Sequence, residues 1–207
     1  MKWPFYLLLC FILQHCASVS FVDKHKLHGD VGSLTVETYE TKDGVKSLVE
    51  KTNYIFTKNG RVKFSQTFDG KNNLTEVAEK KLWFIKRSYP EIDPYYCKTR
   101  WKPKQRERIS CYTQKQYKQN EKIFHYNNDG SIHKIVDNFT TFYTDYYEYD
   151  SAGNLSKIVT KDKEGNDVET YTITCKAKDV HGNCIDLEKK STKTNTILNI
   201  ISKPTYL

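Results

Sequence analysis

The feature that most constrains the fold of this chain is a short turn pattern that recurs along it. In each copy an Asx residue stands three positions before a glycine, and an apolar or cysteine residue follows that glycine by two, at residues 126–132, 149–155 and 178–184. The Asx side chain can cap a turn, and the glycine can adopt the positive φ that closes a type I turn with a bulge. The pattern therefore predicts a series of β-hairpins.

The composition favours the same fold class. The 207 residues include 15 tyrosines and 10 phenylalanines, which suit pleated sheets. The mean hydropathy of −0.71 indicates that one face of each sheet is in water. We expect a mainly β protein, an antiparallel meander of hairpins, with strands near residues 34–39, 46–57, 61–68, 108–116, 122–126, 132–138, 141–149, 155–161, 169–176, 184–188 and 196–201.

One segment departs from the strand pattern. Four apolar residues stand at helical spacing: Leu74, Ala78, Leu82 and Ile85. Thr75 can cap the first turn of such a helix. Residues 75–87 therefore predict one short helix. Pro90 and Pro94 then separate a segment of residues 21–90 from a cysteine-containing segment of residues 91–207, which we expect to form one continuous domain.

Residues 1–20 indicate an export signal. Lys2 precedes an apolar run at residues 4–13, and Ser18-Val19-Ser20 offers small residues for a signal peptidase. We expect cleavage near Phe21 and a periplasmic or extracellular location. In the alternative, residues 13–16 form a lipobox and Cys16 carries a lipid, although a histidine directly before the cysteine fits that motif poorly.

Four cysteines follow the export signal: Cys97, Cys111, Cys175 and Cys184. Their spacing lacks the close pairs of zinc sites, and an exported chain is exposed to oxidation, so we expect disulfides. Three pairings are possible. We favour Cys97–Cys111 because equal parity puts both residues on one face of a hairpin, which leaves Cys175–Cys184. The third turn would set Cys175 opposite Leu187, so the second bridge requires a bulge.

Residues 98–108 contain six basic side chains against one acidic, and all six stand at even-numbered positions. On an extended chain they share one side, with Trp101 on the other. A hairpin centred on residue 104 sets Arg100 opposite Arg108 and Lys102 opposite Arg106, and such repulsion favours an anionic ligand. The candidate ligand-binding residues are Arg100, Trp101, Lys102, Lys104, Arg106 and Arg108.

The alternative is that this basic segment is a solvated loop. The expected partner is an anionic envelope component or an acidic protein rather than a nucleic acid. A membrane is expected only if Cys16 is lipidated.

The sequence contains none of the hydrolase, zinc-protease, P-loop or dinucleotide-binding motifs. His25 and His28 form an H-x-x-H pair, which we expect in a loose N-terminal segment rather than around a metal. Clustered tyrosines between residues 143 and 149 are expected mainly in the core. We therefore predict no catalytic residue, no metal and no cofactor.

The recurrent turn resembles the YD repeat of RHS-type bacterial surface and secreted proteins. Residues 149–155 begin with Tyr149-Asp150 and carry Gly153 at the offset of that repeat, while residues 126–132 have Asn127 in place of the aspartate. The resemblance covers residues 126–190, with a fainter copy at 54–70. It implies a strand-turn-strand ladder in a bacterial exported protein and no catalytic residue.

Together these features predict an exported, non-enzymatic, β-rich binding protein of the bacterial periplasm or cell surface, with a basic hairpin for an anionic ligand. Three alternatives remain. The chain could be an immunity protein against a toxin directed at the envelope, a secreted enzyme with an unrecognised site, or a purely structural envelope component.

Overall fold

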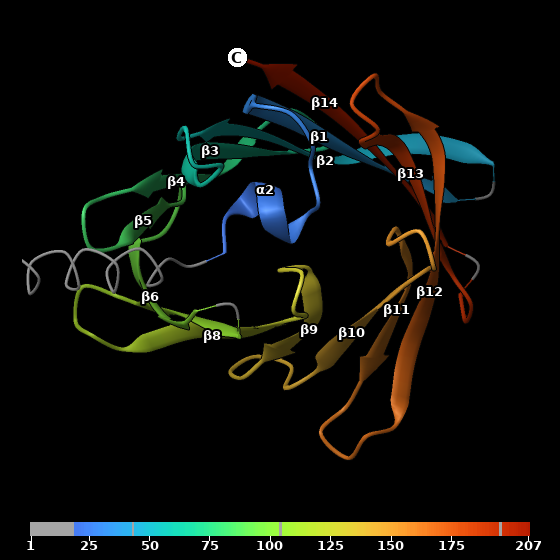
Figure 1. Ribbon diagram of the computed structural model, residues 1–207. Coiled ribbons are helices and arrows are strands. Elements are labelled where there is room, and N and C mark those ends of the chain that lie inside the picture. The colour runs from blue at the N-terminus through green and yellow to red at the C-terminus, as the bar shows by residue number, and fades with distance from the viewer. Residues whose placement is uncertain (1–18, 43, 104, 195) are drawn as a thin grey trace, which may run out of the picture.

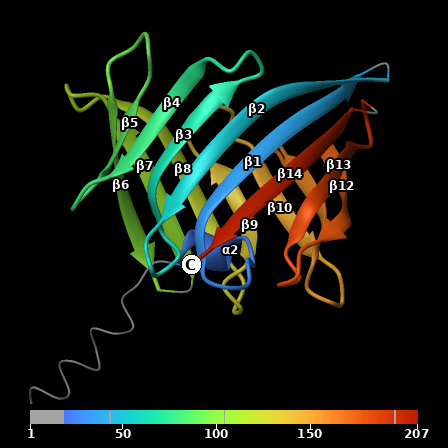
Figure 2. The same ribbon diagram turned by 90° about the horizontal axis from the view of Figure 1, so that it is seen from above.

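The computed structural model describes residues 19–42, 44–103, 105–194 and 196–207. Within these residues, fourteen antiparallel strands form one closed barrel, and the short helix α2 precedes them (Figures 1 and 2). Each strand pairs with its neighbours in the chain, and β1 closes the ring on β14. The bounds are α2 (Phe21–Lys24), β1 (Val31–Lys42), β2 (Val45–Phe56), β3 (Val62–Asp69), β4 (Leu74–Lys80), β5 (Ile85–Ser88), β6 (Tyr95–Lys102), β7 (Arg106–Tyr112), β8 (Lys118–Tyr126), β9 (Ile132–Asp137), β10 (Thr144–Tyr149), β11 (Leu155–Lys161), β12 (Asp167–Lys178), β13 (Cys184–Ser191) and β14 (Ile197–Tyr206).

The predicted β class is confirmed, and the closed barrel is more specific than the expected meander. The closed sheet takes β1–β5 from residues 21–90 and β6–β14 from residues 91–207. Most of the predicted export signal, Cys16 included, lies outside the described residues; Val19 and Ser20 lie within them. No helix in the described ranges is long and apolar enough to cross a membrane.

The recurrent turns do close hairpins. In the turns after β10 and β12, Asp150 and Asp179 each accept a hydrogen bond from the backbone N–H of the asparagine four residues later, at 2.8 Å. The turn after β11 has the same pattern, in which Asp162 accepts from Asn166 at 2.8 Å. Its glycine, Gly165, has a φ of +91°. The pattern therefore extends to a turn outside the three copies named above and is general hairpin chemistry.

The helix expected at residues 75–87 is wrong, because strands β4 and β5 occupy this segment. Leu82, which seemed to continue an apolar helical face, is 81% exposed in the turn between the two strands. Ala78 is buried in the wall, paired with Ser65 of β3 and Arg87 of β5. Pairing on both edges satisfies the backbone and outweighs a weak helical spacing.

Alternate side chains along each strand face the lumen and the outer surface. Leu34 and Val36 of β1 face the lumen, where Val31, Leu34 and Phe56 form a buried cluster. The positions between them are polar, as at Thr35. The apolar face of the sheet therefore lines the inside of the barrel.

The expected disulfides are present. Cys97 and Cys111 stand directly opposite each other on β6 and β7 and are bridged. Cys175 of β12 pairs with Leu187 in the register, and the register then shifts twice before Lys178. These irregularities turn Cys175 towards Cys184, and the two are bridged.

Candidate functional site

The N-terminal residues 19–30, which we call the plug, close one end of the barrel. The Ser20 side chain caps α2 by accepting the backbone N–H of Asp23 at 3.0 Å. Figures 1 and 2 show α2 inside the ring of strands, close to one end. The Phe21 ring lies 4.9 and 5.3 Å from the rings of Tyr54 and Phe56 of β2. The expected loose N-terminus is therefore an internal element of the fold.

Lys24 of the plug forms an ion pair with Glu107 of β7, and both side chains are largely buried, at 13% and 8% exposed. The hydroxyl of Tyr126 on β8 donates to the same carboxylate at 2.7 Å. Burial, followed by the negative charge of Glu107, raises the pKa of Tyr126. The Lys24 ammonium also lies 5.0 Å from the centre of the Phe124 ring. This contact holds the plug to the β7–β8 wall.

Lys26 joins the plug to two of the recurrent turns. Its ammonium pairs with Asp129 at 2.8 Å in the turn after β8, and it donates to the Gly153 carbonyl at 3.2 Å in the turn after β10. It also lies 4.8 Å from the centre of the Tyr149 ring. The hydrogen bond from Lys26, with those from Ser131, lowers the pKa of Asp129 to about 2.

Asn183, in the turn after β12, holds the end of the plug. This buried side chain accepts the backbone N–H of His28 at 2.6 Å and donates to the His28 carbonyl at 2.9 Å. On the opposite side of α2, the Val22 N–H donates to the Gly60 carbonyl in the turn after β2 at 3.2 Å. All four turns singled out in the sequence thus lie at one rim and contact the plug.

The aromatic residues that contact the plug belong to the recurrent turn pattern. In the sequence they therefore look like part of the turns and do not by themselves indicate a plug. The aromatic residue four positions before the glycine is Tyr126 in one copy and Tyr149 in another, and each ring lies under a plug lysine. In the faint copy the equivalent residue is Phe56, which contacts Phe21. These rings therefore receive the plug rather than mark a repeat family.

Behind the plug the barrel contains a cavity of about 610 Å³. The plug contributes to the cavity lining two apolar side chains, Phe21 and Leu27, and four basic or imidazole side chains, Lys24, His25, Lys26 and His28. The wall, from β1 and β10–β14, contributes mainly apolar side chains, among them Leu34, Tyr147, Ile158, Ile173, Leu187 and Ile200. Its volume lies within the range of about 300–1,000 Å³ usual for small-molecule sites. The cavity is thus a mostly apolar space of ligand size that opens to solvent.

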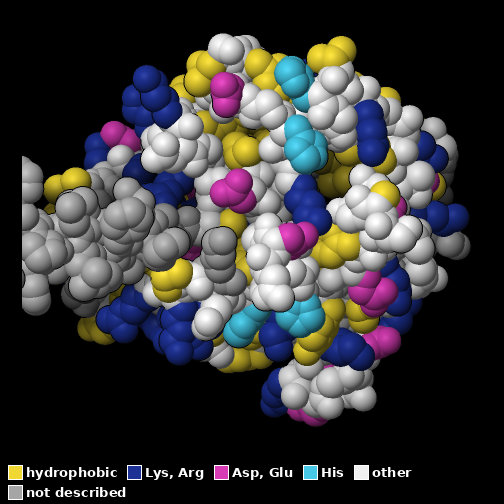
Figure 3. All heavy atoms as spheres, viewed as in Figure 1, with side chains coloured by type: hydrophobic (Ala, Val, Ile, Leu, Met, Phe, Trp, Pro, Cys, Tyr) yellow, Lys and Arg dark blue, Asp and Glu magenta, His cyan; other side chains and the backbone are white. Residues whose placement is uncertain are grey.

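His25 is a plug residue that lines this cavity. Its side chain is exposed to the open space of the lumen, while the protein around the lumen separates it from bulk water. This burial, followed by the positive charge of Lys24, lowers the pKa of His25 to about 4. His25 is therefore neutral at pH 7 and adds no charge to the lining. Figure 3 looks onto this end of the barrel, where histidine side chains gather and hydrophobic side chains are visible in the hollows.

The lumen becomes polar towards the end opposite the plug. The Lys189 ammonium of β13 lies 3.9 Å from the centre of the Tyr171 ring. Burial lowers the pKa of Lys189, while the carboxylates of Asp145 and Glu169 act to raise it. Thr160 donates to Asp145 at 2.6 Å. The cavity therefore has an apolar wall along β10–β14, with polar side chains both at the plug and at the opposite end.

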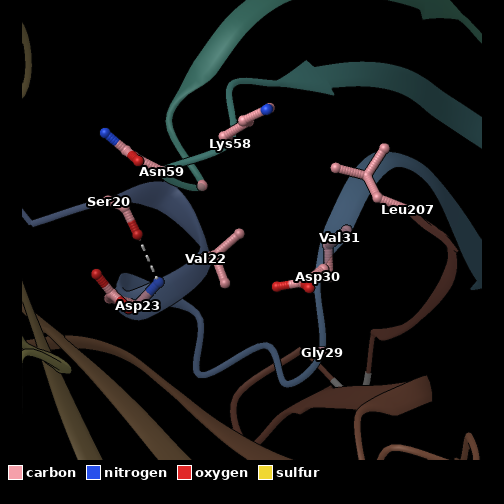
Figure 4. Close-up of a pocket in the computed structure, with 10 residues that line it drawn as sticks. Ser20, Val22, Asp23, Gly29, Asp30, Val31, Lys58, Asn59 and Leu207 are labelled. Atoms are coloured by element: carbon pink, nitrogen blue, oxygen red, sulfur yellow. Dashed lines mark hydrogen bonds between the residues drawn. The ribbon is translucent and has the colours of Figure 1, made fainter.

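A second cleft, of about 460 Å³, lies where the plug meets the turn after β2 (Figure 4). Asp23, Asp30 and Lys58 lie on its sides, together with the C-terminal Leu207. The Ser20 hydroxyl, the one potential nucleophile among the side chains drawn in Figure 4, accepts the hydrogen bond that caps α2. The lumen is the better candidate site, because this cleft is smaller and its charged side chains do not converge on one point.

The candidate anion-binding residues lie elsewhere, on the outer wall. The register pairs Arg100 with Arg108 and Lys102 with Arg106. Glu107 faces the lumen, so its neighbours on β7 point outwards. Trp101 pairs with Glu107 and therefore lies on the other face from the basic side chains, 46% exposed near the tip of the hairpin. Lys104 lies outside the described residues. The basic hairpin and the cavity are therefore separate features.

Of the clustered tyrosines, Tyr147 and Tyr149 face the cavity. Burial, followed by the charge of Asp145, raises the pKa of Tyr147. Tyr146 lies on the outer face, where Lys134 stands 5.5 Å from its ring centre. In the part of the chain that the structure describes, no group of three or more His, Cys, Asp or Glu side chains could hold a metal ion.

Fold and site together define an antiparallel β-barrel with a plugged, mostly apolar lumen. No family model matches the sequence, and no curated protein matches it. Solved structures that it matches include a LolA superfamily protein from Nitrosomonas europaea, with 9% identity, a TM-score of 0.41 and coverage of 94% of this chain and 90% of that one. A porin-like protein from Bacteroides uniformis has 11% identity, a TM-score of 0.37 and coverage of 83% and 60%. A DUF1329 family protein from Desulfovibrio piger has 10% identity, a TM-score of 0.35 and coverage of 84% of each chain.

At these identities and TM-scores, the solved structures carry no argument about function. The resemblance to RHS and YD-repeat proteins is wrong. No family model of that kind matches, and none of these three solved structures is described as an RHS protein. The supposed repeats are hairpin turns of one closed barrel, and the further copy at Asp162 lies at the end opposite the plug.

Proposed function

We propose that this protein is an exported, non-enzymatic binding protein that holds the hydrocarbon part of an amphiphilic ligand in its lumen. The observation that carries the proposal is the cavity of about 610 Å³ behind the plug, lined mainly by apolar side chains. Transfer of apolar surface from water into such a space is favourable by about 25 cal/mol per Å². The lumen is therefore the part of the molecule best suited to an apolar ligand.

The charged groups at the end opposite the plug support one orientation of the ligand in the lumen. The hydrocarbon tail lies against Leu187 and Ile200 and ends near Phe21 of the plug. The head group lies towards Lys189 and Tyr171, where hydrogen-bonding and charged groups face the lumen. An amphiphile satisfies both environments, whereas a wholly apolar molecule would leave the polar wall unpaired.

Export is supported by two independent features. The apolar run and small residues before Phe21 have the form of a signal peptide. The two disulfides, Cys97–Cys111 and Cys175–Cys184, belong to an oxidising compartment such as the periplasm or the cell exterior.

The proposal is tested with a series of saturated fatty acids that compete with a pyrene-labelled fatty acid, read by its fluorescence. Each added methylene should tighten binding by about fourfold until the tail fills the cavity. Leu187→Trp and Ile200→Trp should weaken binding at least tenfold, because the new rings occupy the lumen.

The matched control is Thr172→Trp, since Thr172 is exposed and neighbours the lumen-facing Ile173 on the same strand. It should leave binding unchanged. Circular dichroism spectra verify that each variant folds. Affinity that does not depend on chain length, or that survives both lumen substitutions in folded protein, would show that the lumen is not the binding site.

A further inference from the structure

A row of basic side chains crosses the outer wall close to the plugged end. The register places Lys102 of β6 opposite Arg106 of β7, Arg106 opposite His125 of β8, and His125 opposite Lys134 of β9. Neighbouring strands lie about 4.8 Å apart, so the row spans about 14 Å. One level further along the strands, Arg100 pairs with Arg108.

These charges have little local compensation. Among the described residues, no ion pair within 4.0 Å involves Lys102, Arg106 or Lys134. The pKa of His125 is lowered by burial first and then by the positive charges of Lys134 and Arg106. Glu121, the acidic residue of the same face, is already paired with Lys118. The face is therefore strongly positive.

The chain enters the barrel beside this row. Val19, the first described residue, contacts the turn after β8, where a Cβ on Gly130 would stand 3.7 Å from its Cγ1. Cys16 precedes Val19 by three residues, a reach of about 11 Å at most. If Cys16 carries a lipid, this attachment lies close to the row. If the chain is cleaved near Phe21, the charges of the row would bind a bilayer without it.

We propose that the outer face of β6–β9 at the plugged end is a docking surface for an anionic phospholipid bilayer. We call this surface the basic face, and its residues are Arg100, Lys102, Arg106, Arg108 and Lys134. The lipid phosphates neutralise charges that repel one another across the strands. The same position would set the plugged end of the lumen next to the bilayer.

The test is cosedimentation of the exported protein with vesicles of phosphatidylcholine containing 30% phosphatidylglycerol. Binding should exceed that to pure phosphatidylcholine vesicles and fall between 50 and 200 mM salt. The variant K102Q/R106Q/K134Q should bind about 100-fold more weakly, at about fivefold for each charge removed.

The matched control K42Q/K46Q/K190Q removes the same number of charges from exposed residues at the opposite end of the barrel and should bind like the unmodified protein. An equal loss in both variants would reduce the effect to net charge and overturn the docking surface. Gel shift of a single-stranded oligonucleotide at a salt concentration where vesicles do not bind would overturn the bilayer as partner. Ligand binding in the lumen is measured separately by fatty-acid competition. Each proposal can therefore fail without affecting the test of the other.

Discussion

At the scale of single residues, the side chains that hold the plug have partners far away in the sequence. Lys24 and Glu107 are 83 residues apart, and His28 and Asn183 are 155 apart. The sequence predicted the opposition of Arg100 and Arg108 correctly, because a local hairpin and the alternation of side chains determine it. Pairs that depend on closure of the whole sheet have no comparable local pattern, so the plug could not be predicted.

The first prediction concerns the buried Lys24–Glu107 ion pair. Glu107→Gln should lower the free energy of unfolding by about 3 kcal/mol, because it leaves a buried ammonium without its counter-charge. Urea unfolding followed by circular dichroism measures this. The double variant Lys24→Met with Glu107→Gln should recover most of the loss. Equal stability of Glu107→Gln and the unmodified protein would mean that the pair is hydrated.

Glu121 predicts an acid-sensitive contribution to stability. Burial alone would raise its pKa, but hydrogen bonds from Ser110, Asn138 and Lys118 outweigh it and lower the pKa to about 2. A folded-state pKa below the unfolded value of 4.5 means that stability is present above pH 4.5 and is lost as the pH falls towards 2.

Glu121→Gln should therefore reduce stability at pH 7 by about 2 kcal/mol, because a buried amide cannot replace the carboxylate that Ser110, Asn138 and Lys118 stabilise. It should also flatten the pH dependence of unfolding between pH 4.5 and 2. Urea titrations at several pH values measure both effects. An unchanged slope in this interval would exclude Glu121 as its source.

At the scale of elements, the plug is the part that sequence patterns missed, while most of the strands were predicted. Strands such as β9 and β11 stand between clear turn signals and alternate along their length. β4 and β5 were mistaken for a helix because Leu74 and Leu82, whose spacing suggested an apolar face, are exposed. A helix as short as α2 depends on the Ser20 cap and on the surrounding wall, and neither produces a periodic pattern.

Asn183 provides the element-scale prediction. Its side chain makes four hydrogen bonds, two of them to His28 of the plug. Asn183→Ala should loosen the plug and speed tryptic cleavage after Lys24 and Lys26 by about tenfold, because local opening governs proteolysis. Mass spectrometry of timed digests measures the rate.

Asn166→Ala is the matched control for this experiment. Asn166 has the same place in the turn after β11 and bonds to Asp162 in the same way, but at the opposite end of the barrel. Its cleavage rate should equal that of the unmodified protein. Similar acceleration in both variants would point to a general weakening of turns instead of release of the plug.

At the scale of the whole molecule, the sequence did not indicate that the sheet closes into a barrel. Hairpin signals specify each neighbouring pair, and a meander follows from them. Whether the first and last strands meet depends on the twist and stagger accumulated over the entire sheet, which no single turn contains. The apolar lumen also depends on closure of the barrel. Leu34 and Ile200 line the cavity, and in an open meander their face of the sheet would be exposed to water.

The pairing of β1 with β14 has a consequence for how the chain reaches its native state. Thr35 pairs with Lys203, so the contacts that complete the sheet join residues 168 positions apart. Until the last strand has left the ribosome or the export channel, β1 has one unpaired edge and the apolar interior lies open. The barrel can therefore close only after β14 has been released. Until then, a partner that covers the free edge of β1 would protect the chain from aggregation.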